Sequence, residues 1–244
     1  MIAKKFFALA MFLIALALPL FAYTDTFKST SEDPEYVALI TALKNGEDES
    51  TVLSSYNEYL DSGITPVERC RVEYHMARYY KDKNDKNEGK AHIEMMKKLY
   101  DELPEDTTAF ERLVCETELT SAEYYVTRKL SVGMDNSDLA KQLYKEYPED
   151  VFSVMNEAWR LIYTPGIAGG STKKAIALLD DLTKGHPELT YIDRYSILCA
   201  YAIAYNARGE YKKANEYFEK AFEYFVAEAD VVETYKSNLE KLSE

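Results

Sequence analysis

Residues 198–221 read LCAYAIAYNARGEYKKANEYFEKA, and this stretch decides the fold class. Small residues recur at helical spacing in its two halves, at Ala202, Ala214 and Ala221. Small side chains at such positions let two helix backbones approach each other, while larger neighbours fill the space beside them. Gly209 lies between the halves and permits a tight turn. The stretch therefore predicts two antiparallel helices joined by a short turn.

The same pattern recurs along the chain. Prolines at the junctions of amphipathic segments, Pro66, Pro104, Pro148 and Pro187, follow one another at intervals of 38, 44 and 39 residues. Proline ends one helix and suits the first turn of the next, where its missing N–H is not needed. Softer breaks are expected at residues 45–46, 82–89, 133–138, 164–172 and 208–210. Helix pairs that repeat at about 40 residues predict a helical solenoid.

The last period resembles the tetratricopeptide repeat at nearly every signature position between Leu198 and Ala221. The preceding period resembles it in its second helix. The resemblance implies an all-α, right-handed superhelical solenoid of antiparallel helix pairs, with about four to five repeats and a C-terminal capping helix. The repeat-packing positions that it assigns are Ala175, Leu179, Leu198, Ala202, Tyr205, Gly209, Ala214, Phe218 and Ala221.

The boundaries follow from local signals. The run from Thr65 to Glu68 has the pattern of a capping box that opens a helix, and residues 33–62 are predicted to form an earlier helix pair. Val226 stands where the repeat family has a closing proline, so the last repeat is expected to run into a final helix at about 228–242. The expected division is a signal peptide at 1–22, an N-terminal extension with one helix pair at 23–65, tetratricopeptide-like repeats at 66–226 and a capping helix at 227–244.

The N-terminus has the pattern of a secretory signal peptide. Lys4 and Lys5 precede an apolar run from Phe6 to Leu18, and Ala22 follows at a plausible cleavage site. The run is short for a bilayer span, which needs roughly 20 residues. An uncleaved anchor is the alternative, because the bulky Leu20 stands where cleavage sites carry a small residue, and it is the only membrane contact that the sequence predicts. The protein is therefore expected to be exported, periplasmic or secreted.

The charge of the chain bounds its partners. The chain has 42 acidic and 29 basic residues, a formal net charge of −13, and removal of Lys4 and Lys5 with the signal peptide gives −13 − 2 = −15. A strongly acidic surface repels phosphate backbones, so no nucleic-acid partner is expected.

The sequence shows no catalytic or metal-binding motif. The cysteines Cys70, Cys115 and Cys199 lie far apart, without metal-ligand spacing, and are expected to be buried free thiols, although one disulfide between two of them would fit an exported chain. The histidines His75, His92 and His186 fall in different periods. No serine or cysteine has a histidine at a spacing that marks a nucleophile and its base. We therefore expect no enzymatic activity, no cofactor and no metal.

Residues 163–175, YTPGIAGGSTKKA, have the composition of a phosphate-binding loop but not its order. Such a loop needs GxxxxGK[ST] after a strand, whereas the sixth residue from Gly166 is Ser171. The stretch is predicted to be an interhelical turn with Ser171 or Thr172 as N-cap. A similar turn occurs in some exported repeat proteins, including components associated with tripartite substrate-uptake transporters.

In tetratricopeptide arrays, the first helices of the pairs line a concave groove. The groove positions that the resemblance assigns are Met155, Trp159 and Tyr163 in one period and Ser196, Cys199, Ile203 and Asn206 in the next. Aromatic and methionine side chains are typical anchors for a peptide or an apolar ligand. The alternative for Trp159, the only tryptophan, is that it packs against a neighbouring repeat.

Two functions follow as hypotheses. The first is an exported, non-catalytic scaffold that binds a protein or peptide partner in its groove. The second is a periplasmic ligand-binding accessory of a tripartite-type solute transporter, with a small apolar ligand near Trp159.

Overall fold

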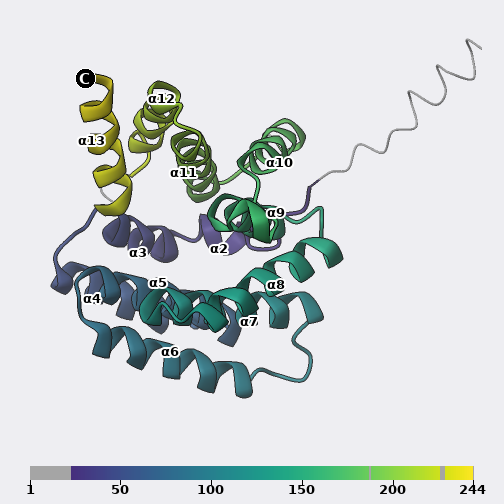
Figure 1. Ribbon diagram of the computed structural model, residues 1–244. Helices are drawn as coiled ribbons and strands as arrows, with labels where there is room; N and C mark the ends of the chain where they lie inside the picture. Colours follow the sequence, from purple (N-terminus) through teal and green to yellow (C-terminus); the bar gives the residue numbers. More distant parts are fainter. Residues whose placement is uncertain (1–22, 187, 226–228, 244) are drawn as a thin grey trace, which may run out of the picture.

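The computed structural model describes residues 23–186, 188–225 and 229–243 (Figure 1). In these ranges, the helices are α2 (Lys28–Glu32), α3 (Pro34–Lys44), α4 (Glu49–Asp61), α5 (Pro66–Asp82), α6 (Lys86–Asp101), α7 (Ala109–Thr127), α8 (Leu130–Glu146), α9 (Val151–Tyr163), the short 3-10 helix η1 (Gly166–Ala168), α10 (Thr172–Gly185), α11 (Tyr191–Ala207), α12 (Tyr211–Phe222) and α13 (Ala229–Ser243). The predicted all-α class is confirmed. The predicted signal peptide at 1–22, Pro187 and Val226 lie outside the described residues.

Local signals in the sequence set the helix starts. The Thr65 side chain accepts a hydrogen bond from the backbone N–H of Glu68, and the Glu68 carboxylate accepts one from the backbone N–H of Thr65, so the predicted capping box opens α5. The same arrangement opens α7 at Thr108 and α11 at Thr190. Ser171 caps α10, as predicted. These caps satisfy N–H groups that the first turn of a helix leaves without a partner inside the helix.

One predicted break, at residues 133–138, is wrong, because these residues lie inside α8. The chain turns earlier, at Arg128, whose backbone is left-handed with φ 58°. Gly133 lies close to the Tyr124 ring, and a Cβ built on it would stand 2.7 Å from that ring. The glycine therefore permits close packing inside a helix rather than a turn. The other predicted breaks follow the ends of α3, α5, α9 and α11.

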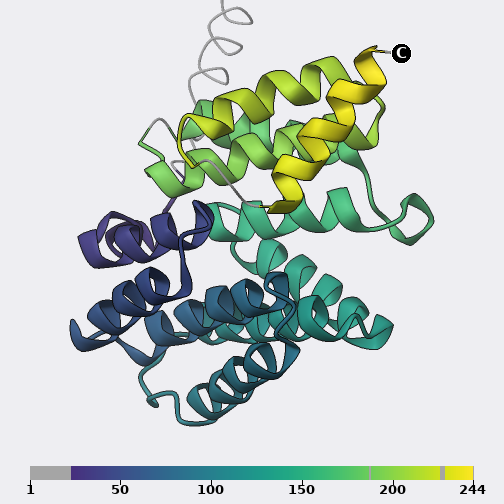
Figure 2. The same ribbon diagram turned by 90° about the vertical axis from the view of Figure 1, so that its left-hand side faces the viewer.

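Consecutive helices pack in pairs along the chain, α3 on α4, α5 on α6, α7 on α8, α9 on α10 and α11 on α12, and α13 packs on α12. The first helices of neighbouring pairs also meet, α5 on α7 and α9 on α11. Figures 1 and 2 show three levels, with α10–α13 on one side, α4–α8 on the other, and α2, α3 and α9 between them. This arrangement is consistent with a solenoid of helix pairs, whereas its right-handed superhelical form stays a prediction.

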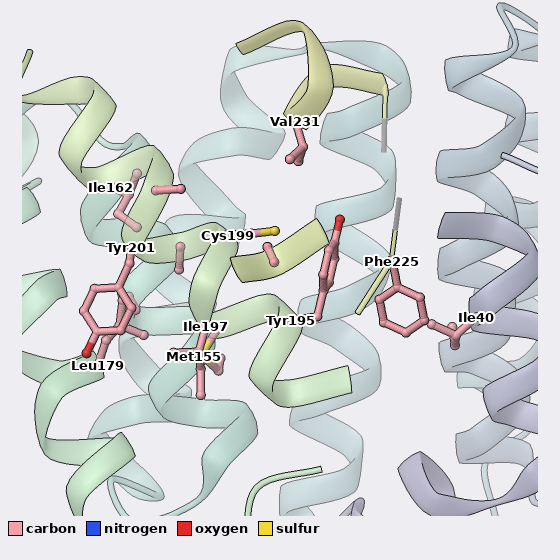
Figure 3. Packing of buried hydrophobic residues seen from close by; sticks show 14 of the residues in the cluster. Ile40, Met155, Ile162, Leu179, Tyr195, Ile197, Cys199, Tyr201, Phe225 and Val231 are labelled. Atoms are coloured by element: carbon pink, nitrogen blue, oxygen red, sulfur yellow. The ribbon is translucent and has the colours of Figure 1, made fainter. Parts of the chain in front are cut away.

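Two hydrophobic cores hold the described helices together. The larger core joins α3, α4 and α5 to α9–α13, and the smaller core lies among α5–α8 together with Phe27. Figure 3 shows part of the larger core, where Ile40 of α3 lies beside Phe225, which follows α12. The ring of Tyr195 in α11 packs edge-on against Phe225, with centroids 4.9 Å apart. Helix α3 therefore packs against the C-terminal repeats, far away in the sequence.

The residues assigned to repeat packing lie in or against the larger core. Ala202, Ala214 and Ala221 are completely buried, which leaves room for α11 and α12 to pack closely. Gly209, with φ 75°, forms the turn between these helices. Among the other assigned positions, Ala175, Leu179, Tyr205 and Phe218 are buried, and Leu198 is partly buried.

Candidate binding surface

The segment before α2 is fixed against the start of α9. The backbone N–H of Thr24 donates to the carbonyl of Glu149 at 2.8 Å, and the N–H of Val151 donates to the carbonyl of Thr24 at 2.9 Å. Thr26 donates to the carboxylate of Asp150 through its backbone N–H, at 3.2 Å, and through its hydroxyl, at 2.8 Å. Because Asp150 also caps α9, the same carboxylate positions both segments.

The side chain of Phe27 lies between α5 and α7 on one side and α9 on the other. Its buried ring lies 6.0 Å from the Phe110 ring of α7 and 5.7 Å from the Phe152 ring of α9, measured between centroids. The guanidinium carbon of Arg71 in α5 lies 3.9 Å from the Phe27 centroid. One side chain of the N-terminal segment thus contacts the first helices of three successive pairs, α5, α7 and α9.

A buried polar network lies beneath Phe27. The Nε of Arg71 donates to a carboxylate oxygen of Glu118 at 3.4 Å, and both side chains are more than nine-tenths buried. Burial raises the pKa of the Glu118 carboxyl, and the positive charge of Arg71 opposes this effect. Nearby, the Tyr36 hydroxyl and Nε2 of His75 are 3.2 Å apart, and burial holds the pKa of His75 well below its usual value. Buried charges need partners of this kind, so the network is a structural one that fixes α5 against α7.

The predicted groove positions have different environments. Met155 and Cys199 are only 7% and 3% exposed, and both lie in the larger core, together with Ile40 of α3 (Figure 3). On α11, Ser196, Ile203 and Asn206 are half-buried. Because Met155 and Cys199 are covered, the predicted stripe presents mainly Trp159 and Tyr163 on its α9 side.

Trp159 and Tyr163 form a stacked pair at the end of α9. Their ring centroids are 5.7 Å apart and their planes differ by 14°. Trp159 packs against the larger core, whereas the Tyr163 side chain is 68% exposed. A stacked aromatic pair is stabilised by about 0.5–1.5 kcal/mol beyond the effect of the area that it buries. The core therefore holds Trp159, and Trp159 in turn supports an exposed tyrosine.

The turn after α9 is closed by its own backbone. The N–H of Gly170 donates to the carbonyl of Pro165 at 3.1 Å, and the N–H of Ser171 donates to the carbonyl of Leu161 at 2.8 Å. Gly170 is required by space, since a Cβ built on it would lie 1.7 Å from the carbonyl oxygen of Thr164. The turn thus has a defined shape although it lies on the surface.

This turn holds an isoleucine in solvent. Ile167, in the short helix η1, is 102% exposed, the highest exposure among the large hydrophobic side chains that the structure describes. We define the Tyr163–Ile167 surface as the side chains of Trp159, Tyr163 and Ile167. The sequence predicts Trp159 and Tyr163 as binding residues but not Ile167, because the glycines around Ile167 indicate only a turn. The signal in the sequence that could have identified Ile167 is its apolar side chain within a predicted turn, where burial by a helix is not expected.

Other groups of chemical interest are held within the fold. All three cysteines are free and buried, as predicted. His92 contacts the carboxylate of Glu73, with Nδ1 and Oε2 2.5 Å apart. Across the described ranges, no group of three or more His, Cys, Asp or Glu side chains is placed to hold a metal ion. None of the helices described has both the length and the hydropathy of a membrane span.

Comparisons with protein-family models, with curated proteins and with solved structures gave no match for this chain.

Proposed function

We propose that the protein is an exported, non-catalytic scaffold of tetratricopeptide type, which binds a partner protein through the Tyr163–Ile167 surface. The observation that carries this proposal is the complete exposure of Ile167 on a turn that the backbone closes. Exposure of an apolar side chain to water is unfavourable, and burial of that side chain in an apolar pocket of a partner would stabilise the complex. Burying one isoleucine side chain contributes roughly 1.5–3 kcal/mol.

The ordered backbone of the turn adds to this support. A binding segment that already has its bound shape loses little conformational freedom on association. The stacked pair of Trp159 and Tyr163, at the end of the helix that precedes the turn, gives the same advantage, since aromatic rings have few rotatable bonds. The partner that fits is a folded protein with an apolar pocket for Ile167 and a flat surface for Tyr163.

The alternative function, a ligand-binding accessory of a transporter, has less support. It requires an open apolar stripe at Met155, Trp159 and Tyr163, and Met155 is buried in the larger core. The scaffold needs mainly Tyr163 and Ile167, and both are exposed.

Native mass spectrometry of the protein, purified gently from the envelope of the cells that make it, separates the two proposals. The scaffold predicts a complex with a second polypeptide, which is lost from an Ile167→Asp variant and kept in a Lys212→Gln variant, altered at an exposed residue of α12. A retained small mass that disappears in a Trp159→Ala variant would instead establish the accessory function.

A further inference from the structure

A second surface combines cations and aromatic rings at the C-terminal halves of α5 and α7. The ring of Tyr125 has three cations close to it, with Arg128 Cζ at 4.7 Å, Arg78 Cζ at 4.8 Å and Lys81 Nζ at 5.8 Å from its centroid. We call Tyr74, Arg78, Lys81, Tyr125 and Arg128 the Tyr125 patch. It lies in the lower level of the fold, where α5 and α7 pack together (Figure 1).

Aromatic groups and one carboxylate order the patch. The Tyr125 hydroxyl donates to Asp82 at 2.7 Å, and Nη1 of Arg78 donates to the hydroxyl of Tyr74 at 3.1 Å. Arg128 also stands 5.9 Å from the centroid of the Tyr124 ring. Planar guanidinium groups held over rings are pre-oriented, so they lose little freedom when they bind a carboxylate through two hydrogen bonds.

The gathering of cations is unusual for this chain, which has 42 acidic and 29 basic residues. Three like charges around one ring repel one another, and the faces of the aromatic rings and the Asp82 carboxylate offset part of that repulsion. An anionic ligand would offset more of it. The patch continues into the corner between α7 and α8, where Lys129 is exposed and the side chains of Leu130 and Met134 are 76% and 63% exposed.

We propose that the Tyr125 patch and this corner bind an acidic segment of the partner protein. Carboxylates of the segment pair with Arg78 and Arg128, and its aliphatic side chains lie on Leu130 and Met134. The inference rests on the proposed scaffold function and adds the chemistry of its partner. An acidic peptide can keep its carboxylates at Arg78 and Arg128, away from the exposed Asp135 and Asp138 of α8, whereas an extended anionic bilayer would also face these two aspartates and be repelled by them.

Fluorescence anisotropy tests the inference with a fluorescein-labelled dodecapeptide of alternating pairs of glutamate and leucine. We expect saturable binding to the full chain that weakens as salt increases, because screening reduces the attraction between charges. The variant Arg128→Gln/Lys129→Gln is expected to weaken binding at least tenfold. Lys212→Gln/Lys236→Gln removes the same charge from exposed residues of α12 and α13 and is expected to leave binding unchanged.

If both double variants lost the same affinity for the peptide, the inference would be overturned. Such a result would show that the peptide is attracted by the overall charge and not by a defined site. Absence of saturable binding would also overturn it. Binding to phosphatidylglycerol vesicles that is lost with Arg128→Gln/Lys129→Gln, together with no peptide binding, would assign the patch to a membrane instead. Because the peptide does not probe Ile167, an Ile167→Asp variant should bind it normally, and partner capture through Ile167 can survive failure of this test.

Discussion

The guanidinium carbon of Arg71 lies 3.9 Å from the centroid of the Phe27 ring. Through this contact, the N-terminal segment is joined to α5 at Arg71, which lies 71 − 27 = 44 residues further along the chain. The same ring contacts Phe110 and Phe152, so it connects the smaller core to the start of α9. Phe27 is therefore expected to contribute to the stability of the whole chain rather than to that of α2 alone.

Phe27→Ala should lower the free energy of unfolding by about 3–5 kcal/mol, because it removes a buried aromatic side chain from a closely packed site. Equilibrium unfolding in urea, followed by circular dichroism, measures the change. Lys28→Ala is the matched control next to it, since the ion pair of Lys28 with Glu188 is on the surface and contributes little. A loss below about 1 kcal/mol for Phe27→Ala would contradict the position of this ring.

Arg71→Met should destabilise the protein by about 3–5 kcal/mol, because it leaves the Glu118 carboxylate buried without its cation. Adding Glu118→Leu to this variant should restore most of the loss, since an apolar pair of similar volume no longer has a charge to bury. The measurement is a double-mutant cycle on the free energy of unfolding. Additive losses from the two substitutions would show that Arg71 and Glu118 do not form a buried pair.

Gly170→Ala should disrupt the turn after α9, because the added Cβ would overlap the carbonyl oxygen of Thr164, only 1.7 Å away. We expect a loss of about 1–3 kcal/mol in the free energy of unfolding and weaker partner binding. Gly166→Ala is the control in the same turn, since nothing lies within 4 Å of a Cβ there. Equal stability of the two variants, measured by thermal unfolding, would argue against the closed turn.

Asp25 should make stability depend on pH. Its burial, with Asp193 and Asp150 nearby, raises the pKa of the Asp25 carboxyl to about 7, although Arg71 opposes the shift. The folded state therefore keeps a proton that the unfolded state has already released, between about pH 4 and pH 7. The contribution of Asp25 to stability is complete below that window and is lost as the pH rises through it.

The measurement is the urea midpoint at several pH values for the natural chain and for Asp25→Asn, which cannot ionise. The natural chain should lose stability relative to the variant between about pH 4 and pH 7. Parallel curves for the two proteins would show that Asp25 ionises with its usual pKa.

The sequence predicted the elements that depend on neighbours along the chain. Caps at Thr65 and Ser171 and the turn at Gly209 are local signals, and the structure has each of them. The failed break at 133–138 shows the limit of such signals, because Gly133 serves a contact with Tyr124 that the sequence alone does not show.

The candidate site depends on contacts between distant segments, and it was therefore predicted only in part. Cys199 has the correct helical spacing for a groove, but α3 from the other end of the chain packs into the same core. Arg71 and Glu118 are ordinary charged residues in the sequence, and only the fold buries them together. In the sequence, Ile167 looks like any core isoleucine, and only the structure shows that none of the described helices covers its side chain.

The measurement that tests the scaffold most directly is site-specific photo-cross-linking in the cells that make the protein. A photoreactive amino acid replaces Ile167 in one variant and Ala207, an exposed residue at the end of α11, in another. We predict one discrete polypeptide adduct at position 167, reduced when Tyr163 is also changed to Ala, and no such adduct at position 207. No adduct at 167, or the same adducts at both positions, would contradict it.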